Sequence, residues 1–191
     1  MSEDLSRLQQ WVGRTEARED VVAADRVAAM AATLDLDIGP RPGEALPPGW
    51  HWMFFNTRGA ARARDIGADG HPKRGGFLPD VPLPRRMWAG GRLAYSERAI
   101  RVGEAIRRSS EIAKVDVNQG RSGTLVFVLV KHRIEGAGGG VIDEEHDIVY
   151  RDAPQPGTPA PPPPAAPSGA AWTESIKPDP VLLFRYSALT F

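Results

Sequence analysis

The chain has 191 residues, with 24 lysines and arginines balanced by 24 aspartates and glutamates, 41% hydrophobic residues, 25% charged residues and no cysteine. This composition is typical of a globular protein, and the zero net charge argues against electrostatic capture of nucleic acid or anionic membrane. Without cysteine there is no disulfide, thiolate metal site or cysteine nucleophile. A signal-peptide pattern and an apolar run of ~20 residues are both absent, so we expect a cytoplasmic protein that binds neither nucleic acid nor membrane.

The N-terminal part predicts two short helices with an extended segment between them. Apolar residues recur at helical spacing over 5–12, and Gly13 is placed to end that helix. Residues 15–22 are polar and extended in character. Over 27–34 the apolar residues follow the i, i+3, i+4, i+7 pattern, which predicts a short apolar helix buried against a sheet.

Residues 39–84 are rich in proline and glycine and predict a long loop. Within it, residues 50–55 contain two tryptophans, a methionine and two phenylalanines, which are too apolar to remain in solvent. Loops of this length are usually functional or disordered, and the aromatic cluster favours a functional, anchored loop.

Four antiparallel strands are predicted next, separated by turn-rich segments. They cover residues 87–97, 104–118, 123–135 and 140–151. The third strand is the most apolar and carries apolar side chains on both faces, which places it near the middle of a sheet covered on both sides. A short apolar helix followed by an antiparallel meander predicts an α+β fold, with the helix packed on one face of the sheet.

A proline-rich stretch divides the chain into three parts. We expect a first domain over 1–152, an extended Pro/Ala-rich linker over 153–171, and an apolar tail over 172–191 that begins a second folding unit. Such a tail needs a surface on which to pack.

The most distinctive motif is Pro-Arg-Arg-Met-Trp-Ala-Gly-Gly-Arg-Leu at 84–93. Its paired arginines, tryptophan and glycine pair would let guanidinium groups and backbone amides approach a phosphate or thioester closely. The alternative is structural: Gly90 and Gly91 form a strand-edge bulge, Trp88 fills the core and the arginines are solvated. From the residues alone, the structural interpretation is favoured.

A second polar motif, Asp-Glu-Glu-His-Asp at 143–147, gathers four carboxylates and an imidazole. On a strand, Glu144 and His146 point to one face and the other three residues to the opposite face. A polar solvent-facing surface explains this run better than a metal site, because the spacing matches no ligand pattern. We expect His132 to be a packed or rim histidine, and His51 has no partner recognisable from the sequence. The glycine-rich stretches at 70–76 and 136–140 match no nucleotide-binding motif.

Taken in order, several segments resemble the MaoC-related hydroxyacyl-thioester dehydratases of the hotdog fold. The resemblance is strongest to their double-hotdog branch, which includes mesaconyl-CoA and itaconyl-CoA hydratases. The segments that carry it are 11–16, 31–35, 85–93, 107–112, 120–128, 144–151 and Leu-Phe-Arg-Tyr-Ser-Ala-Leu-Thr-Phe at 183–191.

This resemblance implies an antiparallel sheet wrapped around a short apolar helix, in the N-terminal half of a protein with two hotdog halves. In that branch, the acid/base groups lie in an Asn-x-His-Arg-Ile-His motif of the second half, which would follow Phe191, so no catalytic residue is carried over to this chain. The implied reaction is the reversible hydration of an enoyl thioester such as mesaconyl-CoA. It is a lyase reaction of fatty acid metabolism that uses general acid/base chemistry and needs no cofactor.

By the same analogy, Arg85, Arg86, Trp88, Gly90 and Gly91 are the substrate-binding candidates that line the acyl and CoA cleft. The implied partners are an acyl-CoA or acyl-carrier thioester and a second hotdog half or a homodimer partner. Two alternatives stay open: a non-catalytic acyl-thioester-binding or assembly module that pairs with a separate catalytic half, and a hotdog thioesterase.

Overall fold

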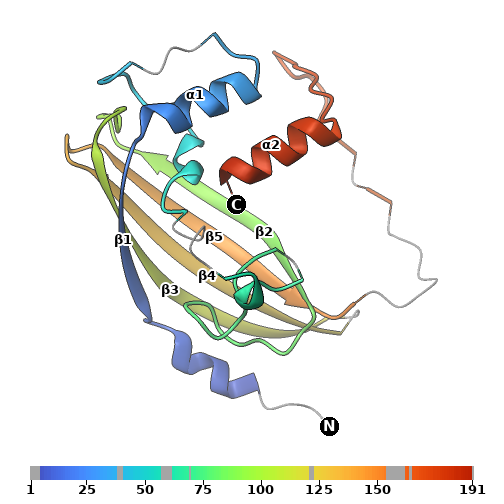
Figure 1. The fold of residues 1–191 in the computed structure, drawn as a ribbon. Coiled ribbons are helices and arrows are strands. Elements are labelled where there is room, and N and C mark those ends of the chain that lie inside the picture. The colour runs from blue at the N-terminus through green and yellow to red at the C-terminus, as the bar shows by residue number, and fades with distance from the viewer. Residues whose placement is uncertain are drawn as a thin grey trace.

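The computed structural model describes residues 5–37, 41–56, 62–68, 70–120, 123–153, 162–163 and 165–190. It consists of one curved antiparallel sheet with helices α1 and α2 on the same side (Figure 1). The strand order across the sheet is β1-β3-β4-β5-β2. The strands are β1 Thr15–Val21, β2 Arg85–Tyr95, β3 Ala105–Gly120, β4 Gly123–Gly136 and β5 Val141–Arg151.

The four predicted strands are confirmed, and the most apolar of them, β4, lies at the centre of the sheet. The predicted meander is right for β3 to β5 and wrong for β2, which pairs with β5 at the far edge. To reach that place, the connection after β2 crosses the end of the β4–β5 hairpin. Gly140 permits the crossing, because a Cβ added there would lie 2.6 Å from the Ile100 nitrogen.

The segment at 15–22, expected to be polar and extended, forms the edge strand β1 and pairs antiparallel with β3. The N-terminal helix is a 3-10 helix, η1 Leu5–Trp11, and Gly13 follows it with a φ of 82°. Helix α1 spans Ala24–Thr33 and buries Val27, Met30 and Ala31 as its periodicity predicted, while Leu34 is its C-cap and is only partly buried. Both helix predictions are therefore confirmed, with the first helix of the tighter type.

We call the sheet surface that faces α1 the inner face and the opposite surface the outer face. On β4, Val126, Val128 and Val130 are buried on the inner face. Leu125, Phe127 and Leu129 on the outer face are only half-buried. The prediction of a sheet covered on both sides is wrong for the part of the chain that the structure describes, because its helices and loops pack on the inner face alone.

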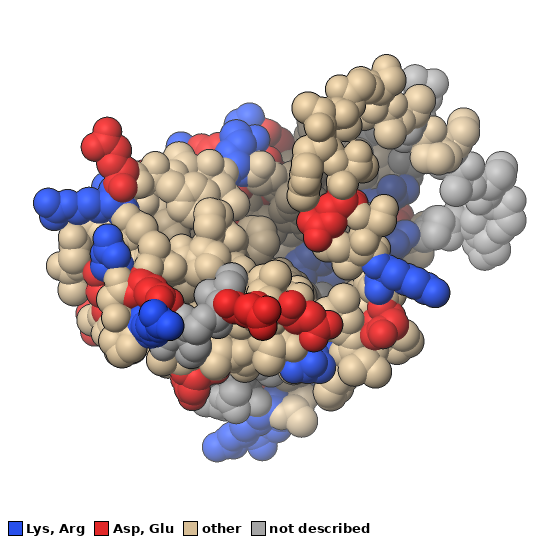
Figure 2. Space-filling view, turned by 90° about the horizontal axis from the view of Figure 1, so that it is seen from above, with Lys and Arg blue, Asp and Glu red and all other residues tan. Residues whose placement is uncertain are grey.

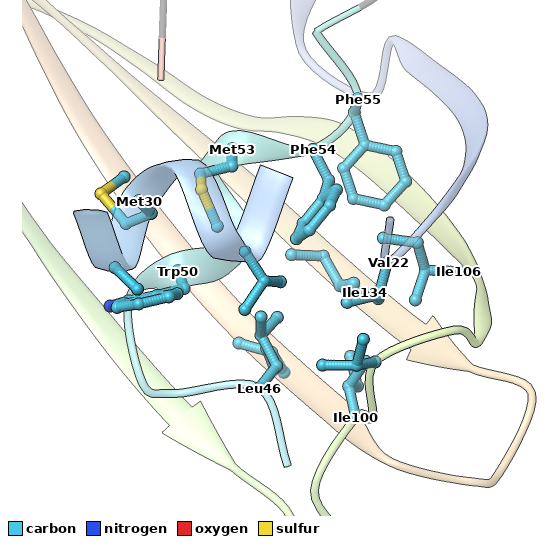
Figure 3. Packing of buried hydrophobic residues seen from close by; sticks show 14 residues of the cluster. Val22, Met30, Leu46, Trp50, Met53, Phe54, Phe55, Ile100, Ile106 and Ile134 are labelled. Atoms are coloured by element: carbon cyan, nitrogen blue, oxygen red, sulfur yellow. The ribbon is translucent and has the colours of Figure 1, made fainter. Parts of the chain in front are cut away.

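The inner face carries two hydrophobic clusters. The first cluster lies under α1 and the aromatic loop (Figure 3), and it contains Val22, Val27, Met30, Ala31, Leu46, Trp50, Met53, Phe54, Phe55, Ile100, Val102, Ile106, Ile134 and Ile142. The second cluster lies at the other end of the strands, and it contains Leu8, Val81, Leu83, Ile112, Val115, Val126, Val128, Val130, Ile148 and Tyr150. The predicted aromatic anchor of the long loop is thereby confirmed for every apolar residue of 50–55 except Trp52.

The apolar tail forms helix α2, Pro180–Thr190, which lies beside α1 (Figure 1). Tyr186 and Leu189 pack against the first cluster, while Val181 and Phe184 are 64% and 75% exposed. Residues 38–40 at the start of the long loop, residues 121–122 of the β3–β4 turn, residues 154–161 and 164 of the predicted linker and Phe191 lie outside the described residues. Within the described ranges, no helix is long and apolar enough to cross a bilayer.

Candidate functional site

The distinctive motif at 84–93 forms the edge strand β2, and Arg74 fixes the segment that leads into it. The Arg74 guanidinium donates to the Val81 carbonyl at 2.6 Å and to the Pro84 carbonyl at 2.9 Å. It also lies 5.2 Å from the centre of the Tyr150 ring, in a cation–π arrangement. The start of β2 is therefore held against the second cluster.

The strand register separates the five candidate binding residues between the two faces of the sheet. Arg86, Trp88 and Gly91 lie on the inner face, and Arg85 and Gly90 lie on the outer face. The inner three are paired with Tyr150, Ile148 and His146 of β5. The structure therefore brings three of the five candidates to the side that carries α1 and the loops.

Trp88 and the glycine pair form the irregular part of β2. The register shifts between Trp88 and Gly90, which confirms the predicted bulge. A Cβ added to Gly91 would lie 3.0 Å from the Glu145 carbonyl oxygen and 3.5 Å from Trp88 Nε1, so the indole lies over this glycine. Trp88 is 69% exposed, and the interpretation that it fills the core is wrong. The reason is its place on an edge strand, beyond both clusters.

A row of polar residues crosses the inner face between the two clusters. Glu16, Ser110, His132 and Glu144 are successive register partners on β1, β3, β4 and β5, and we call them the polar row. Leu93 of β2 completes the row at the sheet edge. The polar row separates the two hydrophobic clusters of the inner face, and Arg108 and His146 are its polar neighbours on β3 and β5.

The motif at 143–147 alternates between the faces as its spacing predicted. On the outer face, Asp143 pairs with Arg133 at 3.0 Å and Glu145 pairs with Lys131 at 3.3 Å. Its inner residue Glu144 belongs to the polar row. The expectation of a polar solvent face is confirmed for the outer residues, but it misses the role of Glu144. Among the described residues, no cluster of acidic groups and histidines suits a metal ion.

His132 is a packed, neutral histidine, as the sequence predicted. Its Nδ1 lies 2.8 Å from Ser110 Oγ, and the serine is 2% exposed. Burial, followed by the positive charge of Arg108, lowers the pKa of His132 to about 4, although the carboxylate of Glu144 acts in the opposite direction. The imidazole therefore carries no charge near neutral pH.

Glu144 is an ionised carboxylate bound to the aromatic loop. Its Oε1 accepts a hydrogen bond from Trp52 Nε1 at 3.0 Å, and its Oε2 lies 3.4 Å from His51 Nε2. Burial alone would raise the pKa of Glu144, but the hydrogen bonds from His51 and Trp52 outweigh it and lower the pKa to about 2. Sequence reasoning found no partner for His51 because the two segments are far apart in the chain. The strand alternation, which places Glu144 on the opposite face from Asp143 and Glu145, is the one feature of the sequence that points to this contact.

The aromatic loop, residues 50–56, begins with η2 Trp50–Met53 and is fixed at its other end by Phe55 and Asn56. Phe55 has a φ of 63°, and its N–H donates to Asp20 Oδ2 at 2.6 Å. The Asn56 amide donates to the carbonyls of Leu189 and Thr190, each at 3.2 Å. These contacts connect β1, the loop and the end of α2.

A groove of about 740 Å³ lies on the outer face, opposite the polar row. Its lining includes Lys131, Arg133, Asp143 and Glu145, which form ion pairs across the strands. A charged ligand would have to compete with these pairs, so the groove is a weaker candidate site than the inner face. From above, Lys/Arg and Asp/Glu side chains are interspersed on the surface (Figure 2).

Comparison with known proteins connects this geometry to one family. Residues 49–191 match the family model described as hydroxyacyl-thioester dehydratase type 2. The chain is also 44% identical, over 185 residues, to the mesaconyl-C(4)-CoA hydratase of Chloroflexus aurantiacus. That match covers 95% of this chain and 64% of the relative, so the chain spans less than two thirds of the relative's length.

Solved structures share the fold at low sequence identity. A MaoC-like dehydratase from Phytophthora capsici has a TM-score of 0.55 at 12% identity, over 96% of this chain and 63% of that chain. The ChsH1-ChsH2 complex from Mycobacterium tuberculosis gives a TM-score of 0.53 at 17% identity, over 87% of this chain and 100% of that chain. HtdX from the same organism gives a TM-score of 0.51 at 19% identity, over 93% of this chain and 60% of that chain. The predicted α+β hotdog fold is confirmed, and the chain belongs to the hydroxyacyl-thioester dehydratase type 2 family.

Proposed function

We propose that this chain is the N-terminal, substrate-shaping half of an acyl-CoA hydratase or 3-hydroxyacyl-thioester dehydratase, a lyase of fatty acid metabolism. The reaction would be the reversible addition of water to an enoyl thioester such as mesaconyl-CoA. The observation that carries the proposal is the 44% identity to a mesaconyl-C(4)-CoA hydratase over 95% of this chain.

The proposed organisation is a hotdog domain over 1–152, a linker over 153–171 and the beginning of a second hotdog half over 172–191. Helix α2 supports this division, because it packs on the first domain through one side and leaves Val181, Leu183 and Phe184 exposed on another. A second hotdog domain, in the same polypeptide or as a partner chain, would cover that side. The ChsH1-ChsH2 structure is itself that of a complex, which supports a partner hotdog.

Hydration of an enoyl thioester needs an acid/base pair at the reacting carbons and amide donors at the thioester oxygen. We propose that the second hotdog domain supplies the acid/base pair and that this chain binds the acyl and CoA groups. Arg86, Trp88 and Gly91 share the inner face of β2, where a guanidinium group and a glycine backbone suit a phosphate or thioester. Arg85 and Gly90 would shape the same edge from its outer side.

The test follows the disappearance of the conjugated enoyl thioester, with mesaconyl-CoA and crotonyl-CoA as substrates. We expect turnover when this chain is combined with its second hotdog domain, and none from the 191 residues alone. Rapid hydration by the 191 residues alone would refute the division of labour. A parallel assay for free thiol separates hydration, which leaves the thioester intact, from the thioesterase alternative.

The assembly-module alternative is favoured by the exposed side of α2 and is tested by light scattering after size-exclusion chromatography. A protein that associates with a second hotdog chain and binds acyl-CoA without converting it would support this alternative. A protein that stays monomeric at high concentration and still hydrates its substrate would exclude it.

A further inference from the structure

We propose that Trp52, held in place by Glu144, forms a wall of the acyl-binding surface on the inner face beside β2 and sets which acyl groups fit there. The inference rests on the proposed acyl-thioester function and adds a binding residue outside the motif at 84–93. Trp52 would contact the substrate, and Glu144 would act as a positioning residue.

Trp52 differs from its neighbours in the aromatic loop. It is 45% exposed, whereas His51, Met53 and Phe54 are each at most 2% exposed. In a 3-10 helix, residues three apart share a side, so the sides that carry Trp50 with Met53 and His51 with Phe54 face the first cluster. The third side of the 3-10 helix carries Trp52 and faces away from the first cluster. The most costly apolar side chain to leave in water is therefore the one that the loop presents outward.

The exposed indole is nonetheless fixed in orientation. Its N–H donates to the Glu144 carboxylate at 3.0 Å, a charge-assisted hydrogen bond that is stronger than one between neutral groups. The second carboxylate oxygen of Glu144 lies 3.4 Å from the buried His51. One oxygen of Glu144 thus accepts the indole hydrogen bond and the other lies against His51, so the surface above it presents an aromatic ring rather than a bare charge. Orienting a side chain before a ligand arrives reduces the entropy lost on binding.

Further apolar side chains surround the same carboxylate on the side of β2. Leu93 is the register partner of Glu144, and it is 39% exposed. Tyr95, 44% exposed, accepts a hydrogen bond from the Gly49 N–H at 3.0 Å and is thereby tied to the start of η2. Trp52, Leu93 and Tyr95 are thus exposed apolar side chains whose positions are fixed through Glu144 and the start of η2, and we treat them as one group.

This group lies next to the proposed thioester-binding edge. Gly91 is two residues before Leu93 on the same inner face, and the groups nearest to the place of its missing side chain are the Glu145 carbonyl and the Trp88 indole. A thioester at Gly91 would bring the apolar part of its acyl chain over Leu93 and towards Trp52. The apolar carbons of an acyl group are therefore the part of the ligand that fits here, while the CoA moiety would not contact Trp52.

The test uses the active protein of the turnover assay above and measures the Kd of CoA and of a series of acyl-CoAs by calorimetry. We expect Trp52→Ala to weaken acyl-CoA binding about tenfold, the effect of losing a favourable apolar contact, while CoA binding changes less than about twofold. Glu144→Ala should weaken acyl-CoA binding as well, and Glu144→Gln should recover part of the loss because an amide oxygen can still accept the indole hydrogen bond. Trp172→Ala is the matched control, since Trp172 is 76% exposed elsewhere.

A second measurement does not depend on replacing Trp52 by alanine. In protein labelled with 5-fluorotryptophan, the resonance assigned to Trp52 by Trp52→Phe should shift with crotonyl-CoA and not with CoA. An unchanged resonance, together with wild-type acyl-CoA affinity in Trp52→Ala, would overturn the inference while leaving the proposed function intact. A loss of assembly mass in Trp52→Ala at unchanged acyl-CoA affinity would also overturn it and assign Trp52 to a protein contact. Absence of turnover and of acyl-CoA binding in the wild type would instead reject the proposed function.

Discussion

Stability should fall as the pH is lowered from 8 to 5, chiefly because of His132. Burial lowers the pKa of His132 to about 4 in the folded protein, against about 6.5 in the unfolded chain. A histidine held neutral contributes stability that is complete above the unfolded pKa and is lost as the pH falls through the window between 6.5 and 4. The gap of about 2.5 pKa units corresponds to ~3 kcal/mol in total, of which ~2 kcal/mol is lost by pH 5.

Other groups act in the same direction, in the same or in a lower pH window. Burial also lowers the pKa of His146, which adds to the loss in the same direction. The stabilising contribution of Glu144, whose pKa is lowered to about 2, is lost only as the pH falls below about 4.5. Measurements between pH 8 and pH 5 therefore report on the histidines.

The measurement is urea unfolding, followed by circular dichroism, of the wild type and of His132→Asn at pH 8 and pH 5. The variant keeps an amide near Nδ1 for Ser110 and cannot titrate, so its loss of stability should be smaller than that of the wild type by ~2 kcal/mol. His71→Asn, which removes an exposed histidine and leaves His132 in place, serves as the control and should keep most of the wild-type loss of stability. An undiminished pH dependence in His132→Asn would show that His132 does not titrate as the structure requires.

Two further predictions concern the framework around the site. Gly140→Ala should destabilise the fold by ~3 kcal/mol in thermal or urea unfolding, because the added methyl group meets backbone atoms at 2.6 to 2.9 Å, whereas Gly76→Ala, with nothing within 4 Å, should cost much less. Equal losses for the two glycines would contradict the tight crossing. Asn56→Ala removes the donor to the last carbonyls of α2, so backbone amides of α2 should exchange with deuterium faster while those of β4 keep the wild-type rate. Unchanged exchange in α2 would mean that its packing on the first cluster suffices to hold it.

Much of the fold could be predicted from local patterns in the sequence. The strands were found because apolar alternation and glycine-rich turns are short-range signals, and α1 because its apolar spacing reports one buried side. The position of β2 at the far edge was not predictable in the same way. Strand order depends on which segments meet in space. The alternation of apolar and polar residues along β2 does not indicate the crossing at Gly140.

The candidate site was predictable only in part. Alternation placed Glu144 on one face of its strand, but its hydrogen bond to Trp52 joins residues 92 positions apart and follows from the packing of the long loop. For Trp88, the interpretation that it fills the core is wrong for a related reason. Its size and apolar character favour burial, but exposure is decided by which elements cover the strand, and the described elements leave the inner side of this edge open.

The polar row also has a consequence for how the domain opens. Because Ser110, His132 and Glu144 separate the first cluster from the second, the sheet supports two small cores closed by different segments of the long loop. The free energy needed to lift one segment does not include the contacts of the other, so the two ends of the inner face are expected to open as separate units. The segment over the second cluster can then loosen beside β2 while the aromatic loop and α2 stay in place. A ligand could enter along one end of the sheet without disturbing the other.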